Sequence, residues 1–194
     1  MGNLKDELEF TLEILIKSGF FNNKEILEII EEQFINEDIN FDDLEISPSK
    51  NNNENFKKLE EAFIDLNKKN ILAIHNCGYD FEDGVADSFE LFYHLKNNGL
   101  HPDGMCFYSF EDIEEAILEG SLFLTFASFN DNKEKTIEIG KTIVNTLKEH
   151  RFTINWTESI DEFIEITNFI WDKSFTDKSY DIEEAFELFK NLHQ

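Results

Sequence analysis

The first seventy residues repeat apolar positions with the period of an α-helix. Apolar side chains recur every three or four positions over residues 4–18, again from about residue 23, and from about residue 55 to 70. This spacing is typical of helices that pack one face against a core. Between the second and third helices, residues 39–55 contain a proline and a run of asparagines, which predicts a linker. We therefore expect a helical amino-terminal region over residues 1–69.

From residue 71 the pattern changes to short apolar runs separated by amphipathic stretches. Strands are expected at residues 71–76, 105–110, 121–129 and 152–156, and helices at 85–99, 111–120, 133–150 and 179–192. Residues 162–171 fit either period, but the short connection after Trp156 favours an antiparallel hairpin.

Alternation of strands and helices is typical of βαβ units around a parallel sheet. The sequence thus predicts an α/β fold: a mostly parallel sheet of about five strands with an antiparallel carboxyl-terminal hairpin, preceded by the helical extension. We expect two parts, residues 1–69 and the α/β domain with its last helix over residues 70–194.

The charge narrows the choice of partners. The chain has 42 acidic residues against 17 basic ones, for a net charge of −25. Such a charge repels phosphate backbones and anionic lipid, so we expect neither a nucleic acid nor a membrane as partner, and a basic protein fits best. The amino terminus has no secretory signal pattern and no apolar run is long enough to span a membrane, which favours the cytoplasm.

The two cysteines, Cys77 and Cys106, lie on separate predicted elements and form no CxxC motif. They therefore indicate neither a disulfide framework nor a structural zinc module. A cysteine nucleophile paired with His75 is disfavoured, because buried cysteines usually act as small apolar side chains. The glycine-rich phosphate-binding motifs and the Gly-x-Ser-x-Gly elbow are not present.

Several motifs in one order resemble a bacterial family catalogued only as a domain of unknown function. They are His75-x-x-Gly78-Tyr79 followed by Asp83-Gly84, Gly104-x-Cys106-Phe107-Tyr108, and Trp171. The resemblance covers about residues 70–173 and leaves the amino-terminal helices and the tail outside it. It implies a shared α/β fold and a cytoplasmic bacterial protein, but no chemistry. Ser109 stands where the resemblance leads us to expect a histidine.

Candidate site residues gather after the first two strands of the predicted sheet. In open α/β sheets, ligands bind where the strands end and their loops begin. His75 and Cys77 are two residues apart, which on a strand places both on one face. The candidate binding residues are His75, Tyr79, Asp80, Asp83, Asp87, Tyr108 and Ser109.

The acidic members of this set allow two interpretations. Imidazole and carboxylates from His75, Asp80, Asp83 and Asp87 suit a divalent metal ion, the one cofactor that we consider. Helix capping alone explains most of them, which favours a structural role: Asp83 as N-cap before Gly84, Asp80 in an Asx turn, and Asp87 near the positive end of the helix dipole. His75 then becomes a core histidine.

Two functions remain, and the sequence leaves open whether the protein is an enzyme. The first is a non-enzymatic protein-binding module, of immunity or antitoxin type, that engages a basic partner. Residues 71–119 carry eleven acidic side chains against one lysine, Lys96, a net charge of −10. The alternative is a small metal-dependent, hydrolase-like enzyme with its site in residues 75–87. The sequence does not indicate an oligomeric state.

Overall fold

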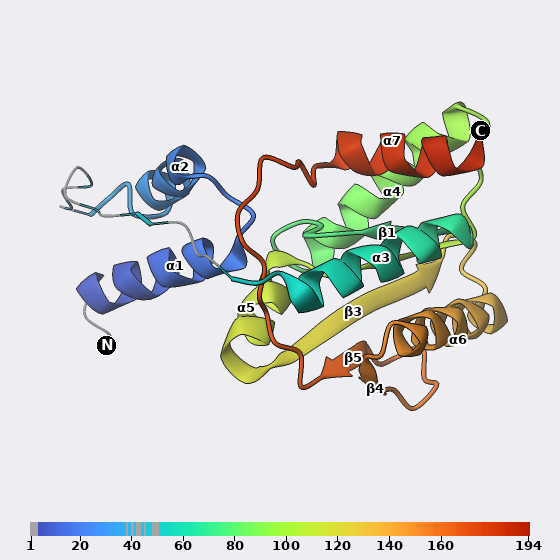
Figure 1. Cartoon of the computed structure of the whole chain (residues 1–194). Helices are drawn as coiled ribbons and strands as arrows, with labels where there is room; N and C mark the ends of the chain where they lie inside the picture. Colours follow the sequence, from blue (N-terminus) through green and yellow to red (C-terminus); the bar gives the residue numbers. More distant parts are fainter. Residues whose placement is uncertain (1–3, 38, 40, 42–43, 45, 48–50) are drawn as a thin grey trace.

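A computed structural model describes residues 4–37, 39, 41, 44, 46–47 and 51–194. These residues form seven helices and one five-stranded sheet (Figure 1). The elements are α1 (Leu4–Ser18), α2 (Asn23–Gln33), α3 (Glu54–Lys68), β1 (Ile71–Ile74), α4 (Phe81–Asn97), β2 (Gly104–Phe107), α5 (Phe110–Glu119), β3 (Ser121–Ser128), α6 (Lys133–Glu149), β4 (Thr153–Asn155), β5 (Ile164–Thr167) and α7 (Ile182–His193). Each helix and strand expected from the sequence is present. Part of the predicted linker, residues 39–55, lies outside the described residues.

The sheet is mixed, with the strand order β1-β2-β3-β5-β4. Only β1 and β2 pair in parallel, whereas the β2–β3, β3–β5 and β4–β5 pairs are antiparallel. The predicted antiparallel hairpin of β4 and β5 is confirmed. The prediction of a mostly parallel sheet is wrong.

The segment between β2 and β3 explains this error. Phe107, at the end of β2, pairs with Thr125, so the first four residues of β3 extend beyond β2 and pair with β5 instead. These four residues of β3 span about 13 Å, and the ten-residue helix α5 before them is about 15 Å long, so the two segments nearly match in length. Helix α5 therefore runs outward past the sheet, and Gly120, in the left-handed conformation (φ 74°), lets β3 return directly.

The other two helical connections do join parallel strands. Helix α4 connects the neighbouring strands β1 and β2. Helix α6 connects β3 to β4, which run in the same direction, and β5 lies between them. The βαβ interpretation is thus correct for these two units, and the later strand β5 fills the gap in the second.

Helices cover the sheet unequally. Helices α3 and α6 pack together over one face, and α4 and α7 pack together over β1 on the other (Figure 1). On β4, the side chains of Thr153 and Asn155 are exposed. Strand β4 alternates exposed and half-buried residues and β5 alternates buried and half-buried ones, as in an antiparallel edge with water on one face. The parallel pair β1–β2 is buried at every position.

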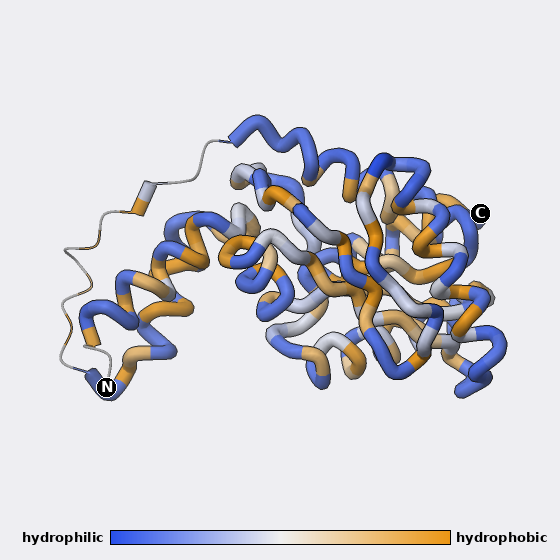
Figure 2. Tube along the Cα trace, turned by 90° about the horizontal axis from the view of Figure 1, so that it is seen from below, coloured by the Kyte–Doolittle hydropathy of each residue, from blue (hydrophilic) through white to orange (hydrophobic). Residues whose placement is uncertain are grey.

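Helices α1 and α2 form a smaller apolar cluster of their own. They project to one side of the sheet, and their apolar turns alternate with polar ones (Figure 2). Helix α2 begins with a capping box in which Asn22 and Glu25 bond to each other's backbone amides. Phe110, the first residue of α5, packs against both this cluster and the main core. The division into residues 1–69 and 70–194 stays a prediction.

The segment Trp171–Lys173 contacts both the end of α1 and the start of α3. Asp172 makes the contact with α3. Helix α3 has no cap from its own N-cap residue, because Asn53 is in the left-handed conformation (φ 57°) and makes no capping bond. The Asp172 carboxylate instead accepts hydrogen bonds from the backbone amides of Asn55 (3.0 Å) and Phe56 (2.9 Å). It satisfies two amides that the helix leaves unpaired and meets the positive end of the helix dipole.

Lys173 and Trp171 hold the end of α1. The ammonium of Lys173, only 2% exposed, donates to the Gly19 carbonyl at 2.6 Å and lies 4.5 Å from the centre of the Phe20 ring. Burial lowers the pKa of Lys173 to about 8. The Trp171 indole donates to the Ser18 carbonyl at 3.1 Å. The three residues therefore fix the α1–α2 pair and α3 to the same point of the chain.

Replacing Asp172 tests this connection. We expect Asp172→Ala to lower the free energy of unfolding by about 2 kcal/mol, because it leaves buried helix amides without acceptors. Denaturation in urea measures the change. The exposed Asp161→Ala serves as the control and should shift stability by less than about 0.5 kcal/mol. Equal stability of the two variants would contradict the capping role of Asp172.

Candidate functional site

The loops that follow β1 and β2 meet at one edge of the sheet and are joined through their backbones. Because β1 and β2 are parallel, their carboxyl ends lie side by side, as the sequence predicts. Three hydrogen bonds connect the loops: Cys77 N–H to Tyr108 O (2.9 Å), Phe110 N–H to Gly78 O (3.1 Å) and Glu111 N–H to Tyr79 O (3.0 Å). The backbone of residues 77–79 is therefore held in one position.

Both glycines of the His-x-x-Gly-Tyr…Asp-Gly motif are required by close packing. Gly78 has a φ of 72°, and a Cβ there would lie 2.5 Å from the backbone nitrogen of Gly84. A Cβ at Gly84 would lie 2.3 Å from the ring of Phe107. These residues let α4 begin directly against the loop and β2, so the close packing accounts for both glycines.

His75 is part of an aromatic cluster. Its ring stacks on Phe63 at 4.3 Å between centroids, and its Nδ1 lies 2.8 Å from the Tyr108 hydroxyl. Burial, with smaller effects of the Lys178 and Lys173 charges, lowers the pKa of His75 to about 3. The imidazole is therefore neutral at neutral pH. A cavity of about 90 Å³ between His75, Tyr180 and α7 adjoins it.

His75 and Cys77 lie on opposite sides of the sheet, contrary to the expected common face. His75 continues the alternation of β1 and points to the α3 side. Asn76 then takes the left-handed conformation (φ 47°), which turns Cys77 into the cluster beneath α4. The strand ends at Ile74, so the two-residue period stops before Cys77.

The acidic residues of the loop act mainly at helix ends. Asp80, not Asp83 as predicted, is the N-cap of α4, and its carboxylate accepts from the Asp83 amide at 3.0 Å. Asp87 lies in the second turn, where burial and then the nearby charges of Asp83 and Glu90 raise its pKa. Ser109 forms a capping box with Asp112 at the start of α5.

These positions do not assemble a metal site. Among the described residues, no group of three or more histidine, cysteine, aspartate or glutamate side chains is placed to hold one ion. The Nδ1 atom of His75 faces Tyr108, and Asp80 bonds to its own helix. The metal-dependent alternative thus gains no support from these side chains.

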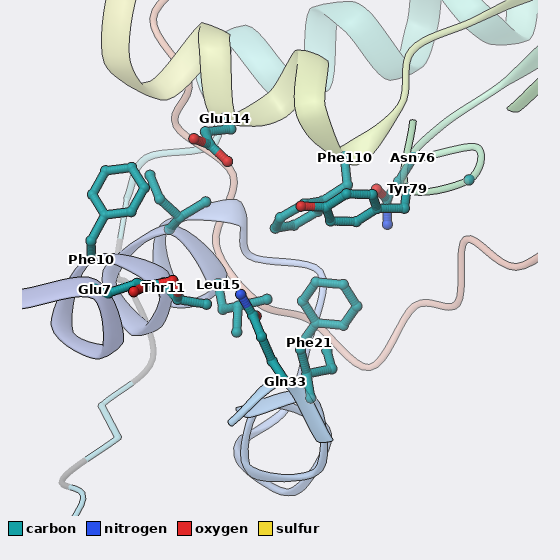
Figure 3. A pocket seen from close by; sticks show the side chains of 13 residues that line it. Glu7, Phe10, Thr11, Leu15, Phe21, Gln33, Asn76, Tyr79, Phe110 and Glu114 are labelled. Atoms are coloured by element: carbon teal, nitrogen blue, oxygen red, sulfur yellow. The ribbon is translucent and has the colours of Figure 1, made fainter. Parts of the chain in front are cut away.

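A larger cavity, of about 580 Å³, opens on the other side of the loop (Figure 3). It lies between the α1–α2 pair and the junction of the loop with α5. The Tyr79 and Phe110 rings form one wall, stacked at 6.0 Å with an angle of 21°, and Phe10 of α1 lies across from them. Thr11, Gln33 and Asn76 add neutral polar groups, and Phe21 and three aliphatic side chains add apolar ones.

The charges at this cavity are negative. Its described charged residues are Glu7 of α1 and Glu114 of α5, which come from facing helices (Figure 3). Burial first, and then the carboxylates of Glu111, Glu114 and Asp80, raise the pKa of Tyr79. The Tyr79 ring thus lies in a field that disfavours added negative charge and favours a cation.

One polar atom beside this cavity has no protein partner. The Oδ1 atom of Asn76 is buried, and no described protein group donates a hydrogen bond to it. The Asn76 side chain lies next to the Tyr79 ring on the cavity wall (Figure 3). A buried acceptor without a bond is costly, so this atom is an unsatisfied acceptor in the wall of the cavity.

The structure divides the predicted site residues into three groups. His75 and Tyr108 contact each other on the α3 side. Asp80 and Ser109 are the N-caps of α4 and α5, and Asp83 and Asp87 lie in the first and second turns of α4. Tyr79 lines the larger cavity. Glu7, Phe10, Phe110 and Glu114 were not predicted. The amphipathic pattern of α1 and α5 marks these positions as surface or core, but it carries no information about which helices face each other.

The chain is an α/β protein with a mixed sheet and a cavity between its sheet edge and an amino-terminal helix pair. Over residues 2–175 it matches the family described as Domain of unknown function (DUF6891), and it belongs to that family. The match includes the amino-terminal helices, which the sequence resemblance left out, and it ends before α7. Comparison with curated proteins finds no match, and comparison with solved structures finds none. In the part of the chain that the structure describes, every helix is too short or too polar to cross a membrane.

The depressed pKa of His75 predicts a loss of stability in mild acid. The unfolded chain takes up a proton near pH 6.5, whereas folded His75 does so only near pH 3. The free energy of unfolding is therefore highest above about pH 6.5. It falls as the pH falls toward 3, by about 1 kcal/mol between pH 7 and 5.5. Urea denaturation at both pH values should show this loss in Tyr108→Phe and not in the double variant H75F/Y108F. Equal losses in the two variants would contradict a buried neutral His75.

The two thiols should be unreactive in the folded protein. Burial raises the pKa of Cys77 to about 12 and raises the pKa of Cys106 further, and both side chains are inaccessible. We expect a thiol reagent at pH 8 to modify them at least about a hundredfold more slowly than free cysteine, and to modify both after unfolding in guanidinium. The exposed Glu134→Cys should react at the ordinary rate. Rapid reaction of either native thiol would restore the nucleophile hypothesis.

Proposed function

We propose that this protein is a non-enzymatic binding module that engages a basic protein, in the manner of an immunity protein or antitoxin. The observation that carries the proposal is a set of exposed aromatic side chains among carboxylates, on the loop after β1, the start of α4 and the residue before β5. Tyr79, Phe81 and Phe163 are 59%, 50% and 51% exposed. Together with Glu82, Asp83, Glu111 and Glu114 they define what we call the acidic aromatic face.

Exposed aromatic residues at one place favour a protein interface. Tyrosine and phenylalanine are enriched at interfaces, and tyrosine is frequent among the residues that dominate binding energy. Phe81 of α4 contacts Phe163 edge to ring at 6.1 Å, and Tyr79 stacks on Phe110. Large apolar surfaces that face water without a partner are costly, so a second protein that covers them gains affinity.

The rigidity of this face favours tight binding. The backbone of Tyr79 is bonded to the start of α5, and Asp80 caps α4 one residue later. A partner therefore need not order the loop when it binds, and the entropy cost of association is lower. Rigid aromatic contacts of this kind occur in other protein-binding surfaces.

The charge of the face selects the partner. Residues 71–119 carry a net charge of −10, and the described charged residues of the adjoining cavity are both glutamates. A basic surface is attracted to such a field over several ångströms, and an acidic one is repelled. The groups best suited to catalysis are engaged elsewhere: His75 is neutral and stacked, and Ser109 caps α5.

Capture experiments with matched variants test the proposal. The tagged full-length chain should retain a protein of net positive charge from a lysate of its host. Tyr79→Ser and Phe81→Ser should each weaken binding of that purified protein at least about tenfold in calorimetry, because each removes an interface aromatic. Raising salt from 50 to 500 mM should weaken it about tenfold or more.

Tyr93→Ser provides the control. Tyr93 is 57% exposed, close to the value for Tyr79, but it lies about three turns along α4 from Phe81, away from the loop that carries Tyr79. It should bind like the unmodified chain. The proposal fails when the captured protein is acidic, when binding does not depend on salt, or when Tyr93→Ser and Tyr79→Ser behave alike.

A further inference from the structure

The cavity beside Tyr79 presents groups that a single chemical class can satisfy. Its volume of about 580 Å³ falls within the range of roughly 300–1,000 Å³ of ligand pockets. Among the described residues, its charged groups are Glu7 and Glu114, carboxylates that accept hydrogen bonds, and no described group donates to the buried Oδ1 of Asn76 in its wall. Acceptors and negative charge together call for a cation that carries several N–H donors.

The aromatic wall distinguishes between the two basic side chains. The Tyr79 ring stacks on Phe110 with an angle of 21° between the ring planes, so the wall offers nearly parallel aromatic faces. A guanidinium is planar, stacks on aromatic faces and has five donors in a fixed plane, whereas an ammonium is a compact, strongly hydrated charge. The apolar residues around these rings, such as Phe10 and Ile14, suit the aliphatic part of an arginine.

We propose that this cavity binds an arginine side chain of the basic partner, with the guanidinium over Tyr79 and between Glu7 and Glu114. The inference rests on the proposed function and names the group that the acidic aromatic face recognises. The cavity lies directly beside Tyr79, so a partner that covers the exposed face of that ring can also reach into the cavity. An arginine there would fill a site that the α1–α2 pair and α5 form jointly.

Small probes test this site without the partner. N-acetyl-L-arginine amide is titrated into the ¹⁵N-labelled full-length chain and followed by the amide shifts of residues around the cavity. The expected dissociation constant is in the millimolar range, because the probe is small. N-acetyl-L-citrulline amide has nearly the same shape without the charge. Its affinity should be lower by about tenfold or more. The lysine analogue should also bind more weakly than arginine.

A pair of neighbouring glutamates supplies matched variants. Glu114→Gln removes one cavity carboxylate and should weaken arginine binding about fivefold to tenfold. Glu115→Gln makes the same change on an exposed residue of α5 that does not line the cavity, and should alter binding less than about twofold. Both variants are on the helix surface, and their melting temperatures confirm that they fold.

The outcomes separate this inference from the proposed function. No binding of the arginine probe at 20 mM, equal binding of the citrulline probe, or equal effects of Glu114→Gln and Glu115→Gln overturns the arginine site. If the arginine site is overturned but binding of the captured basic protein still depends on Tyr79 and Phe81, the proposed function stands. Arginine binding that depends on Glu114, in a chain that retains no basic protein, supports the site and overturns the proposed function.

Discussion

The carboxylate of Asp172 on the amides of α3, with the ammonium of Lys173 on the carbonyl of Gly19, joins three parts of the chain that are distant in sequence. Both charged groups are buried, and burial of a charge is unfavourable unless hydrogen bonds or opposite charge replace its water. Here two helix amides, a carbonyl and aromatic faces do so. The contacts form only when α1, α3 and the end of β5 are all in place, so they favour one arrangement of these elements.

The larger cavity depends on this arrangement. One side of it belongs to α1 and α2, and the other belongs to the loop after β1 and the start of α5. Lys173 and Trp171 hold the end of α1 against the core, while Phe110 packs against both clusters. A site between two apolar clusters needs such a link, because side chains from separate bodies keep a fixed geometry only when the bodies are fixed.

Interactions between residues close in sequence made most of the helices and strands predictable. Predictions failed where the structure depends on contacts between segments distant in sequence. The helical period, the capping residues and the short apolar runs led to the correct order of helices and strands. The direction of β3 was wrong because the outward course of α5 depends on its length relative to the part of β3 that pairs with β5. The cap of α4 was assigned three residues late, since Asp80 and Asp83 are equally good caps by type and only the backbone shows where the helix begins.

The sequence by itself determined the α/β class of the fold and the acidic character, because periodicity and charge are properties of neighbouring residues. It also predicted a candidate site at the junction after β1. It could not show that Cys77 turns away from the face of His75, since a left-handed residue, Asn76, interrupts the alternation of the strand. Nor could it show that Tyr79, which follows a second left-handed residue, Gly78, lines a cavity beside α1. Nor could it show that Glu7 and Glu114 share one cavity. That pairing exists only once two helices separated by about a hundred residues pack side by side, and only the tertiary structure decides which ones do.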